Sequence, residues 1–288
     1  NAQDIKLNGT ISAENNQIKN VANPTDAQDA VTKNYADTQF YTQSEVDAMI
    51  SSLQSQIDGL NAGNDTGTVT DQDGKSYDYI TYGTQIWTVE NAEMVTYRDG
   101  TPIPQVTDNT EWQNLTTGAW CYYGNDSSKG KLYNWYAVMG IHDAASLTDA
   151  SLRKAFAPEG WHVPTDAEWT TLENYLITNG YNYDGTTTGN KIGKAMASTT
   201  GWNTSTNTGA IGNDQSLNND SEFNAIPEGL RDYYGSFFYE GTNTVFWSST
   251  EDNSGIAWNR SLYDDSSNLY RLNNDKRYGF SVRLVKDN

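Results

Sequence analysis

The sequence predicts an α+β protein in which short strands and loops dominate and one helix stands out. Its 9 Trp, 19 Tyr and 7 Phe make 12% of the residues aromatic, although the mean hydropathy is −0.74. Much of the apolar area therefore belongs to rings that also carry polar groups. From about Val69 onward, Gly-rich turns separate short apolar and alternating runs, which is the pattern of short strands joined by loops.

Length and charge limit what the chain can bind. Its 288 residues suffice for roughly one or two domains. It carries 37 Asp and Glu against 18 Lys and Arg, a net charge of −19. Binding to nucleic acid requires a basic surface, and the sequence holds no basic run. No stretch approaches the ~20 apolar residues that cross a bilayer, so we expect neither a nucleic-acid partner nor membrane insertion.

The first region, residues 1–40, combines two strand-like pieces with a helix. The pieces lie at residues 5–11 and 17–21, and Thr25 with Gln28 forms a capping box that opens a helix. These elements contain few apolar residues and would be marginally stable in a single chain. We therefore expect residues 1–40 to associate with other chains.

The second region, residues 41–62, reads as a short coiled-coil helix that follows a capping box of Thr42 and Glu45. Its apolar residues alternate spacings of four and three, the seam of a coiled coil. The predicted oligomerisation residues are Val46, Ile50, Leu53, Ile57 and Leu60. A surface helix packed on its own domain is the alternative, but the polar, Gly-rich residues 63–68 are typical of a linker. The a and d residues favour a dimer on the simple rule, and two heptads do not settle the number of chains.

The third region, residues 69–288, begins with a predicted strand pair whose tight turn is Asp73-Gly74. Its clearest helix starts after Thr165, which forms a capping box with Glu168. The predicted core face of that helix consists of Trp169, Leu172 and Leu176. Further strands are predicted at "VFWSST", "GIAWNRSLY" and "GFSVRLV".

The last of these strands and the segment before it differ in pattern. In residues 279–285, Phe280 and its apolar partners at positions 282 and 284 alternate with Ser281 and Arg283, which predicts a half-buried strand. Residues 263–278 contain Asn, Asp, Ser, Tyr, Lys and Arg without a helical or strand period. We expect this segment to be a polar surface held between apolar anchors.

The sequence offers little catalytic chemistry. His142 and His162 are the only histidines, and the position of His162 between Trp161 and Val163 favours a buried, hydrogen-bonded structural role. Cys121 is alone, which excludes an intramolecular disulfide or a multi-Cys zinc site. No nucleophile elbow or phosphate loop occurs. We expect no enzyme activity and no cofactor.

Metal binding stays open at this stage. Asp71 and Asp73 resemble the start of a calcium loop, but the rest of that pattern is missing and a turn is favoured. Asp264 and Asp265 are adjacent, so on an extended chain they point in opposite directions, and solvated loop charges are the default interpretation. A structural calcium ion remains an open alternative.

Four segments of the third region resemble the Fibrobacter-type major paralogous domain, a family of secreted and surface proteins of bacteria. They are "GTQIWTVEN", "GKLYNWYAVMG", "EGWHVPTDAEWTTLENYL" and the run from "FWSSTEDN" to "GFSVRLVKD". The resemblance covers about residues 69–288 and implies a C-type lectin-like fold of the formylglycine-generating-enzyme subtype, with the last strands as the ligand platform. The paired catalytic cysteines of that enzyme have no counterpart, since Cys121 is single. The calcium and sugar motifs Glu-Pro-Asn, Gln-Pro-Asp and Trp-Asn-Asp do not occur either.

Two further resemblances concern variation and assembly. Residues 253–278 resemble the variable region that diversity-generating retroelements enrich in Asn, Asp, Ser and Tyr. Residues 9–37 resemble a stalk module of phage tail fibres and bacterial surface fibres, in which three chains wind together. We follow the stalk resemblance and expect a homotrimer rather than a dimer.

These observations predict a non-enzymatic extracellular binding or adhesion protein with a lectin-like head on an oligomeric stalk, either a surface adhesin or the receptor-binding tip of a tail fibre. Its expected partner is a protein or glycan on another surface, and its expected place is secreted, on a cell surface or on a virion. The alternative is a structural subunit of a surface filament or of a secretion or motility assembly that docks on a fixed protein partner.

The predicted ligand contacts share a mixture of Tyr with small polar side chains, which paratopes also use. Tyr supplies a large amphipathic area at low entropic cost, and Asn, Asp and Ser supply adaptable hydrogen bonds. For any single residue, a solvated side chain without a ligand is the competing interpretation. The candidates are Asn253, Trp258, Asn259, Ser261, Tyr263, Asp264, Asp265, Asn268, Tyr270, Asn273, Asn274, Asp275, Arg277 and Tyr278.

Overall fold

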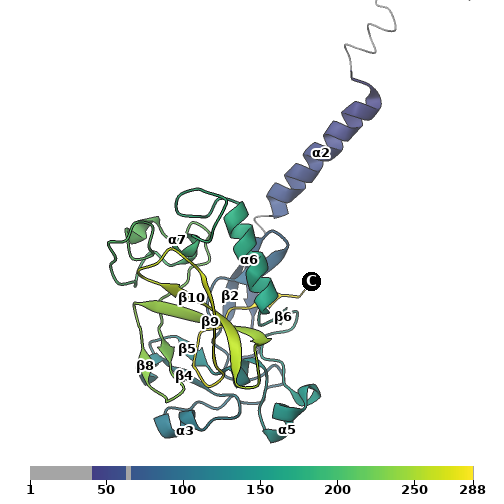
Figure 1. The fold of residues 1–288 in the computed structure, drawn as a ribbon. Coiled ribbons are helices and arrows are strands. Elements are labelled where there is room, and N and C mark those ends of the chain that lie inside the picture. Colours follow the sequence, from purple (N-terminus) through teal and green to yellow (C-terminus); the bar gives the residue numbers. More distant parts are fainter. Residues whose placement is uncertain (1–40, 63–65, 288) are drawn as a thin grey trace, which may run out of the picture. The chain divides into compact units, whose positions relative to one another are not determined.

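The computed structural model describes residues 41–62, with side chains up to Leu53, and residues 66–287 (Figure 1). The chain divides into two compact units at about residue 59. The predicted module at residues 1–40 lies outside the described residues. Residues 63–65, the first half of the predicted linker at 63–68, also lie outside the described residues.

Helix α2, Gln43–Ala62, lies in the first unit except for its last three residues. The predicted capping box is confirmed: the Thr42 backbone N–H donates to Glu45 Oε2 over 2.7 Å, and the Glu45 N–H donates to Thr42 Oγ1 over 3.3 Å. Two seam residues are exposed, Ile50 by 58% and Leu53 by 57%. Val46 is half-buried, and the side chains of Ile57 and Leu60 lie outside the described part.

The second unit is a mixed α and β head domain built on a five-stranded antiparallel sheet. The order of its strands is β1-β2-β3-β12-β6, so the last strand of the chain is inserted between earlier ones. Their bounds are β1 Gly67–Thr70, β2 Ser76–Tyr82, β3 Gln85–Thr88, β6 Trp161–His162 and β12 Val285–Lys286. The predicted strand pair with a turn at Asp73-Gly74 is confirmed, because β1 pairs with β2 in register and Gly74 has a φ of +87°.

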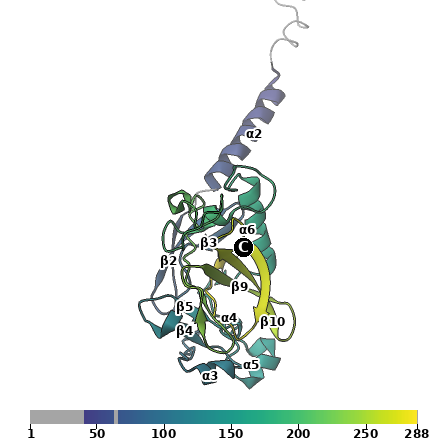
Figure 2. The same ribbon diagram turned by 60° about the vertical axis from the view of Figure 1, so that its left-hand side comes forward.

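A three-stranded antiparallel sheet crosses the domain beside α6 (Figure 1, Figure 2). It consists of β9 Asn243–Glu251, β10 Ile256–Tyr263 and β11 Tyr270–Asp275. β9 and β10 contain the predicted strands. β11 lies in the segment for which we predicted no strand period. It is an edge strand paired only with β10 and exposed over most of its length, so no apolar alternation marks it in the sequence.

Two small sheets and several short helices complete the head domain. The sheets pair β4 Trp120–Tyr122 with β5 Lys131–Tyr133, and β7 Leu230–Arg231 with β8 Phe237–Phe238. The short α-helices are α3 Asn109–Gln113, α4 Trp135–Val138, α5 Ala144–Thr148 and α7 Gly193–Met196. Single 3₁₀ turns are η1 Tyr123–Asn125, η2 Ala150–Leu152 and η3 Gln215–Leu217.

Helix α6, Asp166–Thr178, is the long helix of the head domain, and its predicted capping box and core face are both confirmed. Thr165 and Glu168 exchange the two capping hydrogen bonds over 3.2 and 2.7 Å. Trp169, Leu172 and Leu176 are fully buried. The indole of Trp169 packs 4.7 Å from that of Trp87 on β3, which holds α6 against the five-stranded sheet.

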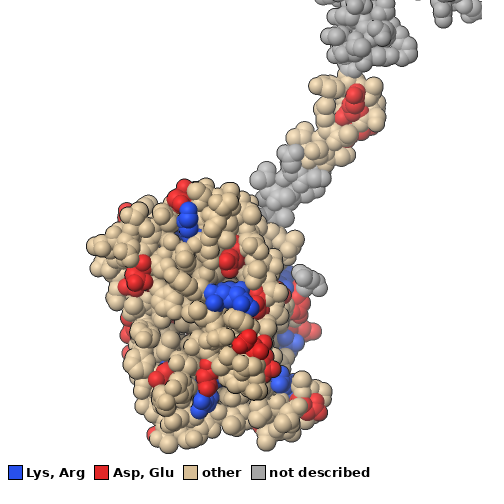
Figure 3. Space-filling view, viewed as in Figure 1, with Lys and Arg blue, Asp and Glu red and all other residues tan. Residues whose placement is uncertain are grey.

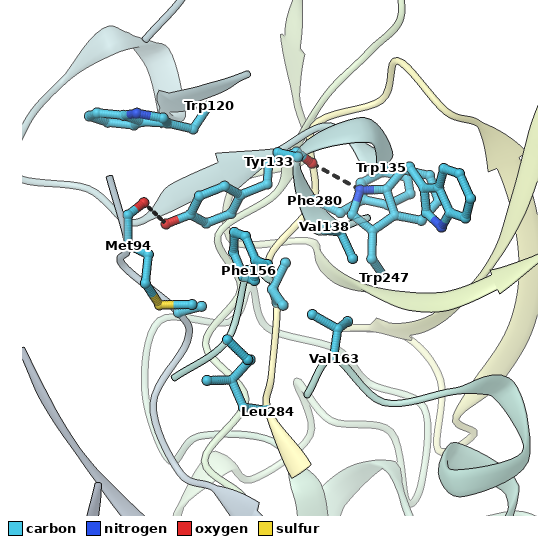
Figure 4. Packing of buried hydrophobic residues seen from close by; sticks show 14 of the residues in the cluster. Met94, Trp120, Tyr133, Trp135, Val138, Phe156, Val163, Trp247, Phe280 and Leu284 are labelled. Atoms are coloured by element: carbon cyan, nitrogen blue, oxygen red, sulfur yellow. Dashed lines mark hydrogen bonds between the residues drawn. The ribbon is translucent and has the colours of Figure 1, made fainter. Parts of the chain in front are cut away.

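The main core is aromatic, and its polar ring atoms bond to backbone carbonyls (Figure 4). The Tyr133 hydroxyl donates to Met94 O over 2.8 Å, and Trp247 Nε1 donates to Tyr133 O over 2.9 Å. Trp135 Nε1 donates to Ser248 O over 3.0 Å. These three rings therefore fill the core with their polar groups paired, whereas the buried hydroxyl of Tyr97 in the same cluster has no hydrogen-bond partner among the described residues.

For residues 279–285 we predicted a strand with one buried face and one solvent-exposed face, and the exposed face is wrong. Ser281 and Arg283 are buried as completely as Phe280 and its apolar partners at 282 and 284. Only Val285 belongs to a regular strand, β12, and the rest of the segment is extended with isolated bridges. The polar positions face other protein elements rather than water.

Arg283 shows how the interior accommodates a polar side chain. Its Nε donates to Asn91 Oδ1 over 2.8 Å, and its two terminal nitrogens donate to Thr88 O and Asn224 O over 3.0 and 3.1 Å. Burial lowers the pKa of Arg283 to about 10, so the guanidinium stays charged at neutral pH. Its plane lies 4.6 Å from the Phe223 ring.

His162 is less buried than predicted, with 38% of its side chain exposed. The expected hydrogen bonding is present: Nε2 lies 2.8 Å from Glu168 Oε1 and Nδ1 lies 2.5 Å from Asp287 Oδ1. The hydrogen bond with Glu168, followed by that with Asp287, raises the pKa of His162 against the effect of burial. The imidazole joins α6 to the C-terminal end of the described chain.

We expect Arg283→Met to lower the free energy of unfolding by about 3 kcal/mol, because it leaves buried carbonyl groups unpaired. Urea unfolding of the full chain measures this. The control is Lys75→Met, which removes an exposed ion pair with Glu93 of 3.2 Å and should change stability by less than about 0.5 kcal/mol. Equal effects of the two substitutions would contradict the role of Arg283.

We expect a proton NMR titration to give His162 a pKa above 6.5, and Glu168→Gln to bring it closer to that value. A raised folded-state pKa means that protonated His162 stabilises the fold in full below about pH 6.5 and that this stabilisation is lost as pH rises through the folded pKa. Gln keeps the capping box. The control Glu111→Gln, on α3, should leave the titration unchanged, and an identical shift in both variants would refute the assignment.

Candidate functional site

A cavity of about 520 Å³ opens where β10, β11 and the β7–β8 hairpin meet. Six of the predicted ligand contacts line this cavity. They lie on β10, on β11 and in the loops that follow these two strands. These six are Ser261, Tyr263, Asp264, Asp265, Asn274 and Tyr278. The structure thus brings together less than half of the predicted set.

Strand alternation decides which predicted residues reach this cavity. In β10, Ser261 and Tyr263 are two positions apart and line the cavity, whereas Trp258 belongs to the opposite face. In β11, Asn274 lines the cavity and Asn273 does not. Trp258 and Asn273 are directly paired across the ladder. The predicted surface is therefore divided between two faces of one sheet.

The opposite face of β10 and β11 packs towards α6. The Arg271 guanidinium stacks 3.4 Å from the Trp258 ring and forms an ion pair with Asp166 at the start of α6 over 2.9 Å. Arg260, which is fully buried, bonds the same Asp166 carboxylate over 2.6 Å. Asn273 Nδ2 donates to Asp252 Oδ2 over 3.2 Å. These contacts give Trp258 and Asn273 structural partners.

Burial removes two further residues from the predicted contact surface. Asn259 and Ser261 are 0% and 1% exposed, so the expectation that they project outward is wrong. Asn259 Nδ2 donates to Asn274 Oδ1 over 2.9 Å, and the Ser261 hydroxyl donates to Asn259 Oδ1 over 3.3 Å. Ser261 thus lines the cavity with almost no exposed surface, and Asn259 does not line it, because β10 is the central strand of its sheet.

The remaining predicted contacts do not line the cavity, and several serve turns. Asn253 Oδ1 accepts from Gly255 N over 2.9 Å in the β9–β10 turn. Arg277 pairs with Asp275 over 2.6 Å and donates to Gln113 O over 3.0 Å. Asn268 receives a 3.2 Å hydrogen bond from Ser267 in the loop before β11. Tyr270 is 36% exposed and stands edge-on to Tyr263, with ring centres 5.3 Å apart.

One wall of the cavity was missed by the sequence analysis. It consists of the β7–β8 hairpin and the turn after it, which contribute Asp232, Phe238 and Tyr239. Phe238 is 45% exposed and Tyr239 is 56% exposed. The available signal was the run "DYYGSFFYEG", in which five aromatic residues occur within a turn-rich stretch. Such residues in loops are enriched at binding surfaces.

The phenols of the cavity are held in place by other rings. Tyr278 lies 5.4 Å from Phe280 of the core and 5.5 Å from Tyr233. Burial raises the pKa of both Tyr263 and Tyr278, which keeps their hydroxyls neutral at physiological pH. The cavity therefore presents neutral rings that are supported from behind.

The described residues contain no group of three or more His, Cys, Asp or Glu side chains that could hold a metal ion. Asp71 Oδ1 instead accepts from the backbone N–H groups of Asp73 and Lys75, both over 2.9 Å. The Asp73 carboxylate accepts from the Thr96 hydroxyl over 2.7 Å. These two carboxylates thus stabilise a turn, as the sequence favoured. Among the described helices, none combines the length and apolar character needed to cross a bilayer.

Comparison with known proteins shows that most of the chain matches one protein family. A family model described as the Fibrobacter succinogenes major domain matches residues 80–286, which include the whole of the cavity. This range is more than two thirds of the chain. No curated protein and no solved structure gives a match.

Proposed function

This chain belongs to the Fibrobacter succinogenes major domain family, and from that premise we propose that it is a non-enzymatic binding protein whose head domain carries the contact surface. The observation that carries the proposal is the aromatic cavity between β10, β11 and the β7–β8 hairpin. Its lining exposes Tyr239 by 56% and Phe238 by 45%, and Tyr270, which is 36% exposed, stands beside Tyr263 of the lining. Exposed aromatic groups around a hollow are typical of recognition surfaces.

We further propose that the head domain has a C-type lectin-like fold. Family membership supports this, as does the packing of α6 on the core. The last strands would form the ligand platform, and β10 and β11 do contribute to the cavity. The partner would be a protein or glycan on another surface, and the protein would act outside the cell, on a cell surface or on a virion.

The N-terminal part would assemble several heads. The exposed side chains of Ile50 and Leu53 lie on one seam of α2, and burial of such a seam between copies of the helix would stabilise an oligomer. We propose a homotrimer. Several heads that engage one surface would raise a weak affinity by about 10² to 10⁴.

The contact surface can be tested with Tyr239→Ala combined with Tyr270→Ala in the full chain. We expect at least about tenfold weaker binding to a glycan array and to a panel of fixed bacterial cells, because exposed tyrosines at a contact commonly supply 1 to 2 kcal/mol or more. Tyr183→Ala is the control, since this ring is 42% exposed and lines a different cavity. Unchanged binding by the double variant, with its thermal unfolding intact, would place the contact surface elsewhere.

Assembly can be tested with Ile50→Glu combined with Leu53→Glu, also in the full chain. Light scattering should show a loss of the oligomer, because charge on the seam opposes its burial, and binding to the same cells should weaken by about 10² to 10⁴. Met49→Glu is the control, because Met49 is 44% exposed but lies off the seam. Cell binding that stays equally strong after dissociation would exclude a role for avidity.

The alternative function is a structural subunit of a surface filament or assembly. It would be favoured if the full chain bound only one protein of such a filament and neither glycans nor other cell-surface proteins.

A further inference from the structure

The walls of the aromatic cavity carry negative charge without positive charge. Asp232, Asp264 and Asp265 line it, and none of its lining residues is Lys or Arg. Burial, followed by the charge of Asp265, raises the pKa of Asp264. Asp264 is half-buried and Asp265 is exposed, so two neighbouring carboxylates meet the cavity and one of them is partly away from water.

Elsewhere in the head domain, acids in comparable settings are neutralised by arginine. Arg260 and Arg271 bind the carboxylate of Asp166, and Arg277 binds that of Asp275. Among the described residues, no ion pair involves Asp264 or Asp265. Figure 3 shows scattered Lys and Arg groups over one face, most of them beside Asp or Glu.

A second, independent feature is an unused acceptor in the same wall. Asn243 lines the cavity, is only 4% exposed, and its Oδ1 receives no hydrogen bond from the described residues. A buried amide oxygen without a donor is costly. The wall thus offers, besides its carboxylates, one buried acceptor that a donor of a ligand could satisfy.

The rings complete the environment. Tyr239, Tyr263 and Tyr278 line the cavity, and the negative face of a phenol attracts a cation, most strongly when water is excluded. A planar guanidinium can stack on such a ring while its N–H groups bond carboxylates in pairs. Neutral ligands would use the rings but leave the carboxylates without a counter-charge.

We propose that this cavity binds a cationic side chain, of the guanidinium class, presented by a protein partner. The inference rests on the proposed function, because it names the chemistry of the partner at the same surface. The net charge of −19 would also favour the approach of a basic partner over long range. Arginine fits better than lysine because it can stack on tyrosine and bond two carboxylates at once.

The test uses the full chain and two labelled peptides, Gly-Arg-Gly-Arg-Gly and the same peptide with citrulline in place of arginine, followed by fluorescence anisotropy. Citrulline keeps the planar shape and loses the charge. We expect the arginine peptide to bind at least about tenfold more tightly, and Asp264→Asn combined with Asp265→Asn to abolish that difference. Asp149→Asn combined with Glu159→Gln removes two exposed acids elsewhere and should leave it intact, which controls for overall charge.

The outcomes separate the inference from the proposed function. Equal binding of the two peptides, or no binding of either, would overturn the cation assignment. So would an equal loss in both doubly substituted variants, which would point to overall charge alone. A binding surface for neutral glycans would survive these results if the Tyr239 and Tyr270 substitutions still abolished binding to the glycan array while the Asp264 and Asp265 substitutions did not.

Discussion

The head domain depends on one extended segment, residues 279–286, which bonds to all four of its sheets. Gly279 exchanges backbone hydrogen bonds with Arg231 of β7, and Phe280 does so with Tyr133 of β5. Ser281 accepts from Trp247 of β9 over 3.2 Å. Finally, β12 pairs with both β3 and β6. Since one segment crosses four sheets, its residues 279–285 have no solvent side, which is why its serine and arginine are buried beside its apolar residues.

This closure of the chain bears on where the proposed contact surface can lie. Residues 279–285 are buried and bond to β9, β10 lies between β9 and β11, and β11 is left as an exposed edge. The residues between Tyr263 and Tyr278 are then attached to the core at both ends, by the β10–β11 ladder on one side and by the packing of Tyr278 on Phe280 on the other. A rigid base of this kind lowers the entropy that is lost when surface side chains are ordered by a partner.

The division of polar side chains between the two faces of the β10–β11 sheet gives them different roles. On the α6 side, arginines neutralise Asp166 and stack on Trp258, so that charge holds the fold together. On the cavity side, Asp264 and Asp265 have no such partner among the described residues. Acidic residues therefore take part in ion pairs on one face and remain without them on the other.

Local patterns in the sequence were sufficient for the elements that depend on neighbours in the chain. The capping boxes at Thr42 and Thr165, the turn at Gly74 and the strands β9 and β10 could be predicted because their signals lie within a few residues. The general position of the candidate site followed from composition, since Tyr and small polar residues cluster near the C-terminus. Only the tertiary structure decided which of them meet. An edge strand such as β11 has no buried face to create a period, the burial of Arg283 depends on carbonyls far away in the chain, and the second wall around Tyr239 is joined to β10 through space alone.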